Sequence, residues 1–396
     1  MRRPAIPPRR RAQPRLAGTV GAVPLGLSGE GSPPVRLGEA ARRLAPVLAL
    51  ALLGLTTGAV LVSAGATLGY DYQAYAHAAQ RLLHGLPLYD PNVDVAGGFA
   101  IYLYPPPFAL AVVPFTLLPG SVGTWAWLGA LVAAFVAGTA ILPVRPQVRW
   151  AIALLAALSL PFLYSVKLGQ VGPLLYLCFA IGWRSLDRPL PLGLAVSVGA
   201  LTKVQPALLF AWMTITRHWR ALLVGLVACG AATLIVTLVT GVATWTDYVA
   251  LLGRVSQPVT TPKNMTPGAI AWRAGASLEV ATAPQWASAA ATLAITVFAW
   301  LRRDPETGFV VGVVASQVLS PLLWDHYAML LLLPVALLLE RRQWWAMVIP
   351  LVTWLPVDAL YPLAFGVCLV APVAGRIRAE GGRSKGRSPL EADQEG

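Results

Sequence analysis

The hydrophobic positions of this chain are gathered in long runs, and the polar positions lie mainly between those runs. Residues 46–68 contain no charged side chain over 23 positions. An α-helix rises about 1.5 Å per residue, so this run is long enough to cross a hydrocarbon core of roughly 30 Å. Similar runs recur almost to the C-terminus. The pattern predicts an all-α fold, a polytopic bundle of transmembrane helices.

Counting the apolar runs between charged residues or proline-glycine breaks gives about twelve candidate spans. They lie at 46–67, 123–143, 150–166, 171–184, 190–202, 205–216, 221–240, 286–301, 309–322, 327–340, 344–358 and 361–374. Several are shorter than the roughly 17 residues that a lone crossing requires. We expect the short spans to lie inside the bundle, to tilt with their flanking residues, or to turn back as re-entrant segments.

Composition agrees with this pattern and explains the charge of the chain. Hydrophobic residues make up 57% of the sequence and charged residues 12%, with a mean hydropathy of +0.65. A soluble domain holds about 25% charged residues. The net charge of +13 is spread over the termini and the short loops. This distribution is typical of membrane-topology signals and requires no nucleic-acid partner.

Arginine placement predicts the orientation, because short cytoplasmic loops collect positive charge. Residues 1–44 hold nine arginines and two glutamates. If the spans alternate, one side also receives the tail 376–387 and Arg145, Arg149, Arg184, Arg188, Arg217, Arg220, Arg302, Arg303, Arg341 and Arg342. We expect a multi-pass protein of the cell (inner) membrane with both termini in the cytoplasm. The long loops 69–122 and 242–285 then lie outside, and any active site is extracytoplasmic.

These patterns divide the chain into three segments. Residues 1–44 are rich in proline and arginine and lack the cleavage pattern of a signal peptide, so we expect a disordered basic cytoplasmic arm. Residues 45–375 form the transmembrane domain. Residues 376–396 are expected to be a disordered cytoplasmic tail.

Several kinds of cofactor chemistry lack their usual sequence signals. The chain has no Gly-rich phosphate loop, no GxGxxG and no HExxH, which argues against ATP or dinucleotide cofactors. No DxD pair occurs, so we expect metal-independent chemistry, although a single Asp with a phosphate could still recruit a cation. Cys178, Cys229 and Cys368 are isolated in apolar runs and indicate core packing.

Asp71 comes just after the first span, at the start of a segment with helical periodicity. The apolar positions recur at spacings of three and four residues: Tyr72, Tyr75, Ala76, Ala79 and Leu82 or Leu83. Polar residues lie on the opposite face, and Gly85 marks the expected end of the helix. The spacing predicts a short amphipathic helix lying on the membrane surface. Asp71 either caps the N-terminus of this helix or carries chemistry, and the pattern alone favours neither.

Lysine usage singles out Lys203. The chain has 26 arginines and four lysines, so most positions that only require positive charge are arginine. Lys203 lies between two apolar runs at membrane depth, where an ammonium group is costly without an anionic partner. The side chain could snorkel to the interface or pair with a carboxylate. A lipid phosphate is the natural functional partner.

Two further outer segments carry candidate residues. His326 lies beside Asp325 and between Trp324 and Tyr327, in a polar island between two apolar runs. It is either a satisfied core histidine or a group that donates to a phosphate or orients a sugar. Arg273 lies in the second outer loop, where most charges are solvated.

These motifs together resemble glycosyltransferase family 87. The family's first outer loop is similar to Asp71–Tyr75, Leu82–Asp90 and Tyr104–Pro106, and its remaining motifs are similar, in the same order, to Gly169–Gly172, Lys203–Pro206 and Ser320–Pro321 with Trp324–His326. The resemblance covers roughly residues 46–345. The family more often has Asn at Gly172, a small polar residue at Leu323 and a second His at Tyr327.

The resemblance implies a GT-C type of bundle that uses a polyprenyl-phosphate sugar, with Asp71 as the catalytic carboxylate. One general base suffices, because a polyprenyl phosphate is already a good leaving group. The resemblance also implies further site residues. Lys203, His326 and Arg273 would hold the donor phosphate, and Tyr89, Tyr104, Gln170, Asp325 and Trp324 would contact substrate.

We therefore expect a hexosyltransferase that moves a sugar, by family resemblance mannose, from a polyprenyl-phosphate donor to a lipid-linked or envelope acceptor with inversion. The main alternative is a transporter or lipid flippase, which would show related halves and charges near the bilayer midplane. The sequence shows no convincing internal repeat, and its conspicuous polar residues gather at one face. A polymerase or ligase of lipid-linked glycans would differ chiefly in the acceptor.

Overall fold

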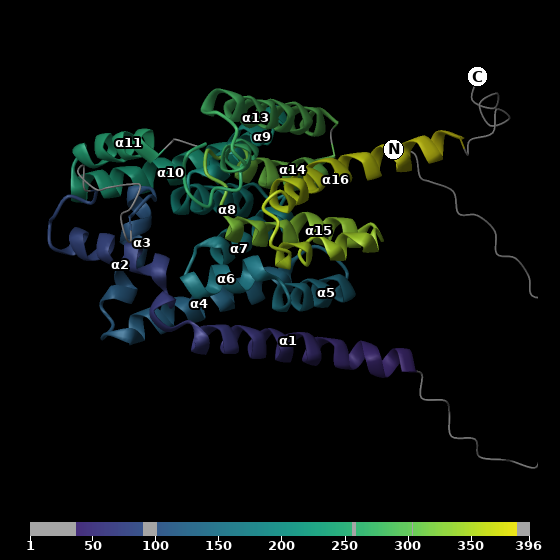
Figure 1. Ribbon diagram of the computed structural model, residues 1–396, viewed down its shortest axis with the longest axis horizontal. Coiled ribbons are helices and arrows are strands. Elements are labelled where there is room, and N and C mark those ends of the chain that lie inside the picture. Colours follow the sequence, from purple (N-terminus) through teal and green to yellow (C-terminus); the bar gives the residue numbers. More distant parts are fainter. Residues whose placement is uncertain (1–36, 90–100, 256–258, 303, 386–396) are drawn as a thin grey trace, which may run out of the picture. The chain divides into compact units, whose positions relative to one another are not determined.

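The computed structural model describes residues 37–89, 101–255, 259–302 and 304–385 (Figure 1). Within these ranges every regular element is a helix, which confirms the predicted all-α class. The chain divides into two units, Met1–Ala41 and Arg42–Gly396. Of the first unit, the structure describes only residues 37–41. The fold described below is therefore that of the second unit.

The helices differ widely in length. The α-helices are α1 (Leu37–Ser63), α2 (Tyr70–Leu83), α3 (Pro106–Thr116), α4 (Ser121–Ile141), α5 (Pro146–Ala157), α6 (Leu160–Leu168), α7 (Gly172–Arg184), α8 (Pro189–Thr202), α9 (Leu208–Ile215), α10 (Trp219–Thr240), α11 (Ala243–Val255), α12 (Pro267–Arg273), α13 (Leu278–Leu301), α14 (Pro305–Val318), α15 (Leu332–Glu340) and α16 (Leu360–Lys385). Five short 3-10 helices complete the set: η1 (Gly65–Thr67), η2 (Gln205–Ala207), η3 (Asp325–Leu331), η4 (Trp344–Val348) and η5 (Val352–Trp354).

Three of the described helices are long and apolar enough to cross a membrane: Leu44–Ser63 within α1, α4 and α10. Helices α5 and α6 are bent by 67° and add a fourth if they form one broken span. Large apolar side chains such as Val62 and Leu238 are 83% and 78% exposed, as expected for faces that contact lipid. Many of the other predicted spans correspond to shorter helices, so the count of twelve stays a prediction.

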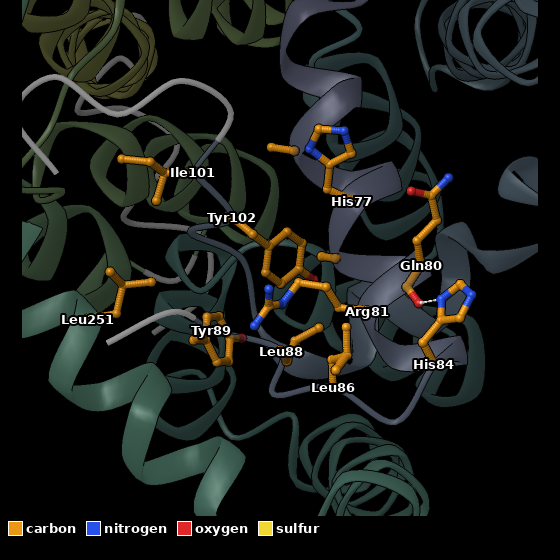
Figure 2. A pocket seen from close by; sticks show the side chains of 12 residues that line it. His77, Gln80, Arg81, His84, Leu86, Leu88, Tyr89, Ile101, Tyr102 and Leu251 are labelled. Atoms are coloured by element: carbon orange, nitrogen blue, oxygen red, sulfur yellow. Dashed lines mark hydrogen bonds between the residues drawn. The ribbon is translucent and has the colours of Figure 1, made fainter. Parts of the chain in front are cut away.

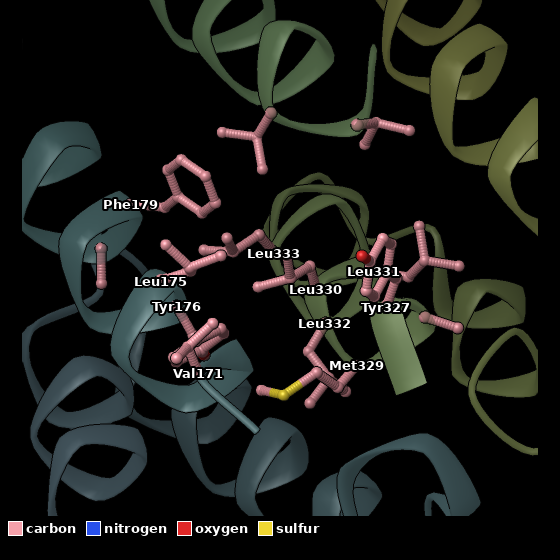
Figure 3. Packing of buried hydrophobic residues seen from close by; sticks show 14 of the residues in the cluster. Val171, Leu175, Tyr176, Phe179, Tyr327, Met329, Leu330, Leu331, Leu332 and Leu333 are labelled. Atoms are coloured by element: carbon pink, nitrogen blue, oxygen red, sulfur yellow. The ribbon is translucent and has the colours of Figure 1, made fainter. Parts of the chain in front are cut away.

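Packing between neighbouring helices builds the bundle. Helix α4 packs against α7, α7 against α8, and α8 against α10 (Figure 1). Figure 3 shows the core beside this row, where Leu330–Leu333 and Met329 meet Leu175, Tyr176 and Phe179 of α7. Tyr176 and Met329 are fully buried. This apolar floor fixes η3, which carries Asp325 and His326, against the start of α7.

Arginines tie the ends of several helices together. Arg145 bonds to Glu340 at 3.0 Å, and Arg341 bonds to Asp304 at 3.3 Å. Arg184 donates to the carbonyl of the last residue of α4. Loops that are distant in sequence therefore meet at one end of the bundle, as their predicted location on a common side of the membrane requires.

The predicted segment boundaries fall inside helices. Helix α1 begins at Leu37 and α16 continues to Lys385, whereas the predicted arms end at residue 44 and begin at residue 376. The rest of both arms, 1–36 and 386–396, lies outside the described residues.

The contact between α8 and α10 yields a stability prediction. A Cβ atom on Gly193 would lie 2.4 Å from the Ala221 carbonyl oxygen and 2.8 Å from Val224 Cβ. Small residues allow such close approach of membrane helices. We expect Gly193→Ala to lower the free energy of unfolding by about 1–3 kcal/mol through overpacking.

Thermal unfolding of the detergent-solubilised protein measures this effect. Gly230→Ala is the matched control, because a Cβ there meets nothing within 4 Å. Equal melting temperatures for the two variants would contradict the helix contact.

Candidate active site

Helix α2 presents Asp71 at its start. Its N-cap residue is Gly69, whose φ of +64° suits glycine and whose N–H donates to the Lys167 carbonyl at 2.8 Å. Asp71 is the second residue of the helix and does not cap it, so the N-cap interpretation of Asp71 is wrong. Its carboxylate instead accepts a hydrogen bond from Gln170.

The predicted amphipathic helix corresponds to α2. The helix ends at Leu83, and Gly85 follows with a φ of +65°. Its buried residues are Tyr72, Ala74, Tyr75, Ala78 and Ala79. This face packs on protein, chiefly on α3 and on a cluster of aromatic rings from α3 and α4, rather than on lipid alone.

A chain of hydrogen bonds holds the Asp71 carboxylate. The Tyr75 hydroxyl donates to the Tyr104 hydroxyl at 2.8 Å, and Tyr104 donates to Gln170 Oε1 at 3.0 Å. Gln170 then donates from Nε2 to Asp71 Oδ2. Because its carbonyl is occupied by tyrosine donors, the amide of Gln170 is oriented with its NH₂ group toward the carboxylate.

A glycine turn positions Gln170. Gly169 ends α6 with a φ of +74°, and a Cβ atom there would lie 2.9 Å from Tyr72 Cβ. Trp127 Nε1 donates to the Gly169 carbonyl at 2.8 Å, and its ring stacks on Tyr72 with centroids 5.7 Å apart. The contact therefore requires both the left-handed backbone and the missing side chain of glycine.

Two basic side chains lie on the other side of the cluster. Lys203 follows α8, and its Nζ lies 3.7 Å from the centre of the Tyr327 ring. The side chain of His326 is 8% exposed, and its Nδ1 lies 3.3 Å from Asp325 Oδ1. His326 Nε2 is buried without a hydrogen-bond partner among the described residues. Gln170, Lys203 and His326 share the lining of a cavity of about 10 Å³.

Burial and charge act in opposite directions on Asp71, which lies outside the candidate spans. Burial raises the pKa of its carboxyl above the ordinary value of 3.8. His326, the Gln170 hydrogen bond and Lys203 lower that pKa in part, and Asp325 raises it further. The group is thus a stronger base than an exposed aspartate and still has basic side chains nearby.

Several predicted site residues are brought together and others are not. Asp71, Tyr104, Gln170, Lys203 and His326 form the cluster, with Asp325 at its edge. Among the described residues, Tyr89 is linked to it by a hydrogen bond from its hydroxyl to the Tyr104 carbonyl, at 2.6 Å. Trp324 is partly buried against the core, next in sequence to Asp325.

Arg273 makes a different set of contacts. Its guanidinium bonds to Asp358 at 2.7 Å and to the Asn264 carbonyl at 2.6 Å. The structure therefore places Arg273 beside the loop that supports η3. Within the described residues, the guanidinium of Arg273 forms no hydrogen bond or ion pair with Asp71, Lys203 or His326.

Asn264, which lies in the predicted outer loop 242–285, is fully buried. Its Oδ1 accepts from the Leu323 and Thr266 amides at 2.8 and 3.2 Å, and its Nδ2 donates to the Pro321 carbonyl at 3.1 Å. It fixes the segment that leads into Asp325 and His326. A lone asparagine in a polar loop gives no sequence signal of this role.

At two positions where this chain departs from the family pattern, other side chains pack around the residue that is present. A Cβ atom on Gly172 would lie 2.5 Å from Met329 Sδ, so the space beside Gly172 is already occupied. Tyr327 places its ring under the Lys203 ammonium, a cation–π contact that sequence reasoning missed.

Metal chemistry stays untested by the geometry. The described residues contain no group of three or more His, Cys, Asp and Glu side chains that could hold a metal ion. Asp90, a second carboxylate of the first outer loop, lies outside the described residues.

The described bundle thus combines helices apolar enough to cross a membrane with a cluster that holds the Asp71 carboxylate near the basic side chains of Lys203 and His326. The sequence pattern of glycosyltransferase family 87 matches residues 102–321. This match covers more than half of the chain. The protein belongs to glycosyltransferase family 87 and is a membrane glycosyltransferase.

A curated relative is similar over most of its length. It is the polyprenol-phosphate-mannose-dependent alpha-(1-2)-phosphatidylinositol mannoside mannosyltransferase of Mycobacterium tuberculosis (strain ATCC 25618 / H37Rv). The two sequences are 25% identical over 329 residues, 73% of this chain and 77% of that protein. No solved structure matches the chain.

The Asn264 contacts yield a second stability prediction. We expect Asn264→Ala to lower the free energy of unfolding by about 2–4 kcal/mol, because two buried amides and one carbonyl lose their partners. Thermal unfolding in detergent measures the change. Thr282→Ala is the control, since the partly exposed Thr282 hydroxyl donates to the Leu278 carbonyl of its own helix, and about 0.5 kcal/mol or less is expected there. Similar losses in both variants would contradict the support role of Asn264.

Proposed function

We propose that this glycosyltransferase transfers mannose from a polyprenyl-phosphate donor to a lipid-linked acceptor of the cell envelope, with inversion at the anomeric carbon. The observation that carries the proposal is the half-buried Asp71 carboxylate, held by Gln170 and lying near the basic side chains of Lys203 and His326. The relative's dependence on polyprenol-phosphate-mannose supports the choice of donor.

In this mechanism Asp71 is the general base. An acceptor hydroxyl oxygen forms a bond to the anomeric carbon while Asp71 takes its proton. The bond between the anomeric carbon and the phosphate oxygen breaks, and its electron pair leaves with the polyprenyl phosphate. Direct displacement places the new bond on the opposite face of the sugar and inverts the configuration.

Lys203 and His326 would stabilise the phosphate as it gains charge. The ammonium of Lys203 rests on a ring face, so its N–H donors are not used by any hydrogen bond among the described residues. His326 Nε2 is likewise buried without a partner there. Preorganised donors of this kind stabilise a transition state better than water can, because they need no reorganisation. Asp325 would keep His326 oriented through Nδ1.

Other predicted residues take supporting roles in the proposal. Tyr104 and Trp324 would border the sugar, and Gln170 would hold the base. Arg273 would act through the Asn264 loop on the phosphate side of the site, rather than by direct contact with phosphate. The donor's lipid tail would reach the cluster laterally between helices.

The helix ends support an extracytoplasmic site in a GT-C bundle of about twelve spans. Helix α7 begins beside Gln170 and ends at Arg184, and α8 begins after Arg188 and ends before Lys203. The site and the arginine-rich loops therefore lie at opposite ends of the same helices. With the arginine end in the cytoplasm, as the positive-inside rule favours, Asp71 faces outward.

Asp71→Asn tests the base directly. We expect it to lower kcat by about 100-fold or more, since general-base catalysis contributes typically that much. The assay measures transfer of radiolabelled mannose from synthetic polyprenyl-phosphate mannose to phosphatidylinositol mannoside by the purified, reconstituted protein. Asp187→Asn, an exposed carboxylate at the arginine end, is the matched control and should keep full activity.

The outcomes separate the alternatives. Full activity of a folded Asp71→Asn protein would sink the base assignment and direct attention to Asp325 or Asp90. Transfer by neither wild type nor variant, across several donor sugars, would favour the transporter or flippase alternative.

The pH dependence of kcat/KM gives an independent test. Protonated Asp71 cannot accept a proton, so activity should rise with pH through its pKa, which burial holds above 3.8. Gln170→Leu removes a hydrogen bond that lowers this pKa, so the acid limb should move to higher pH. Rates measured from about pH 4 to pH 9 with both proteins check the direction. An acid limb that stays in place would argue against Gln170 as the residue that positions the base.

A further inference from the structure

An open pocket of about 440 Å³ lies beside α2 (Figure 2). We call it the α2 pocket. Its polar lining includes His77 and Arg81 of α2 and His84 just beyond that helix, and its aromatic lining includes Tyr89 and Tyr102. It shares no lining residue with the small cavity at Lys203 and His326. The pocket is therefore a separate space that the mechanism above does not use.

The charge of the α2 pocket favours an anion. Arg81 is held in place because its Nε donates to the Pro87 carbonyl at 2.6 Å. Among the residues that the structure describes, the terminal nitrogens of its guanidinium have no hydrogen-bond or ion-pair partner, and no Asp or Glu lines the pocket. A fixed guanidinium with free donors matches the geometry of a phosphate. His77 and His84 add imidazole groups at the same rim.

The rest of the lining suits sugar rings. Tyr89 and Tyr102 lie 5.7 Å apart between ring centres, and Leu88 and Leu251 add apolar surface. Figure 2 shows the Arg81 guanidinium beside these rings. Both rings are mostly buried, at 2% and 6% exposed, and both hydroxyls donate to carbonyls, so the pocket meets a fixed aromatic wall of the kind that packs against the apolar side of a sugar.

The α2 pocket is joined to the catalytic cluster. The Tyr89 hydroxyl donates to the Tyr104 carbonyl, and the Tyr104 side chain belongs to the hydrogen-bond chain that reaches Asp71. Arg81 follows Asp71 by ten residues on one helix, which is a rise of about 15 Å. A phosphate bound at Arg81 would thus leave enough space for the sugar of the same molecule to lie between Arg81 and Asp71.

In a displacement with inversion, the acceptor hydroxyl attacks the anomeric carbon from the face opposite the leaving phosphate. Donor phosphate and acceptor must therefore bind on different sides of that carbon. If the donor phosphate takes Lys203 and His326, the acceptor must come from another side. We propose that the α2 pocket binds the acceptor, and that this acceptor is an anionic glycolipid whose head-group phosphate bonds to Arg81 while its sugars lie along Tyr89 and Tyr102. This inference rests on the proposed function for the role of the bound lipid.

Steady-state kinetics with two acceptors test the pocket. The full chain is reconstituted with polyprenyl-phosphate mannose and either phosphatidylinositol mannoside or neutral octyl α-mannopyranoside. Arg81→Gln should raise KM for the phosphorylated acceptor about tenfold or more, as loss of a charge-assisted hydrogen bond implies. KM for the donor and for the neutral acceptor should stay within about twofold.

Matched variants separate charge from folding of the loop. Arg81→Lys keeps the charge and should recover much of the phosphorylated-acceptor affinity. His77→Gln changes the same rim without touching Pro87 and should raise the same KM more mildly. Arg220→Gln removes an exposed arginine at the start of α10 and should match wild type. An unchanged KM in Arg81→Gln, an equal rise for both acceptors, or a rise for the donor would overturn the proposal.

A binding measurement keeps the pocket testable apart from catalysis. Short-chain phosphatidylinositol should bind the wild type more tightly than Arg81→Gln, and inorganic phosphate should compete weakly. Equal binding by both proteins, or phosphate binding as tight as the lipid, would overturn a head-group site. If wild type binds the lipid but transfers no sugar, the proposed function fails and the site stands. If wild type transfers sugar but Arg81→Gln behaves as wild type, the acceptor site fails and the proposed function stands.

Discussion

The candidate site depends on one half-buried carboxylate held close to basic side chains. Removing Asp71 from water is costly, and the Gln170 amide with the nearby charges of Lys203 and His326 offsets that cost. No ion pair joins Asp71 to Lys203 among the contacts of the described residues. The two signs of charge are held close without direct pairing, which leaves the carboxylate able to accept a proton and the cation able to meet a phosphate.

Packing of the surrounding segments fixes the positions of Asp71, Lys203 and His326 relative to one another. The left-handed glycines before and after the cluster, Gly69 and Gly169, let α2 lie directly on the turn that carries Gln170. The Asn264 loop fixes the chain before His326 by three hydrogen bonds, two between the Asn264 side chain and the backbone of Leu323 and Pro321 and one from the Met265 amide to the Leu323 carbonyl. The apolar floor of η3 and α15 closes the remaining side. Each support comes from a different part of the sequence, so the site exists only in the folded bundle.

Local signals made much of the fold predictable. The first span, the amphipathic α2 and the arginine loops follow from runs, spacing and charge, which are properties of neighbouring residues. The short spans were harder, because the 67° bend between α5 and α6 and the 3-10 turns depend on packing against other helices. Within the site, the scarcity of lysine pointed to Lys203, and family motifs pointed to Gln170. Asn264 and the ring of Tyr327 act through contacts far apart in sequence, where periodicity carries no information.

The departures from the family pattern bear on how the site works. Where a second histidine is more common, this chain has Tyr327, and its ring lies 3.7 Å from Lys203 Nζ. An imidazole could bond to the ammonium and consume a donor, whereas a ring face attracts the cation without using its N–H groups. Gly172 lacks the side chain more common there, and Met329 fills that space with an apolar group. Both changes reduce the number of fixed polar partners around Lys203. The N–H groups of Lys203 therefore stay available for the phosphate contact that the proposed function requires.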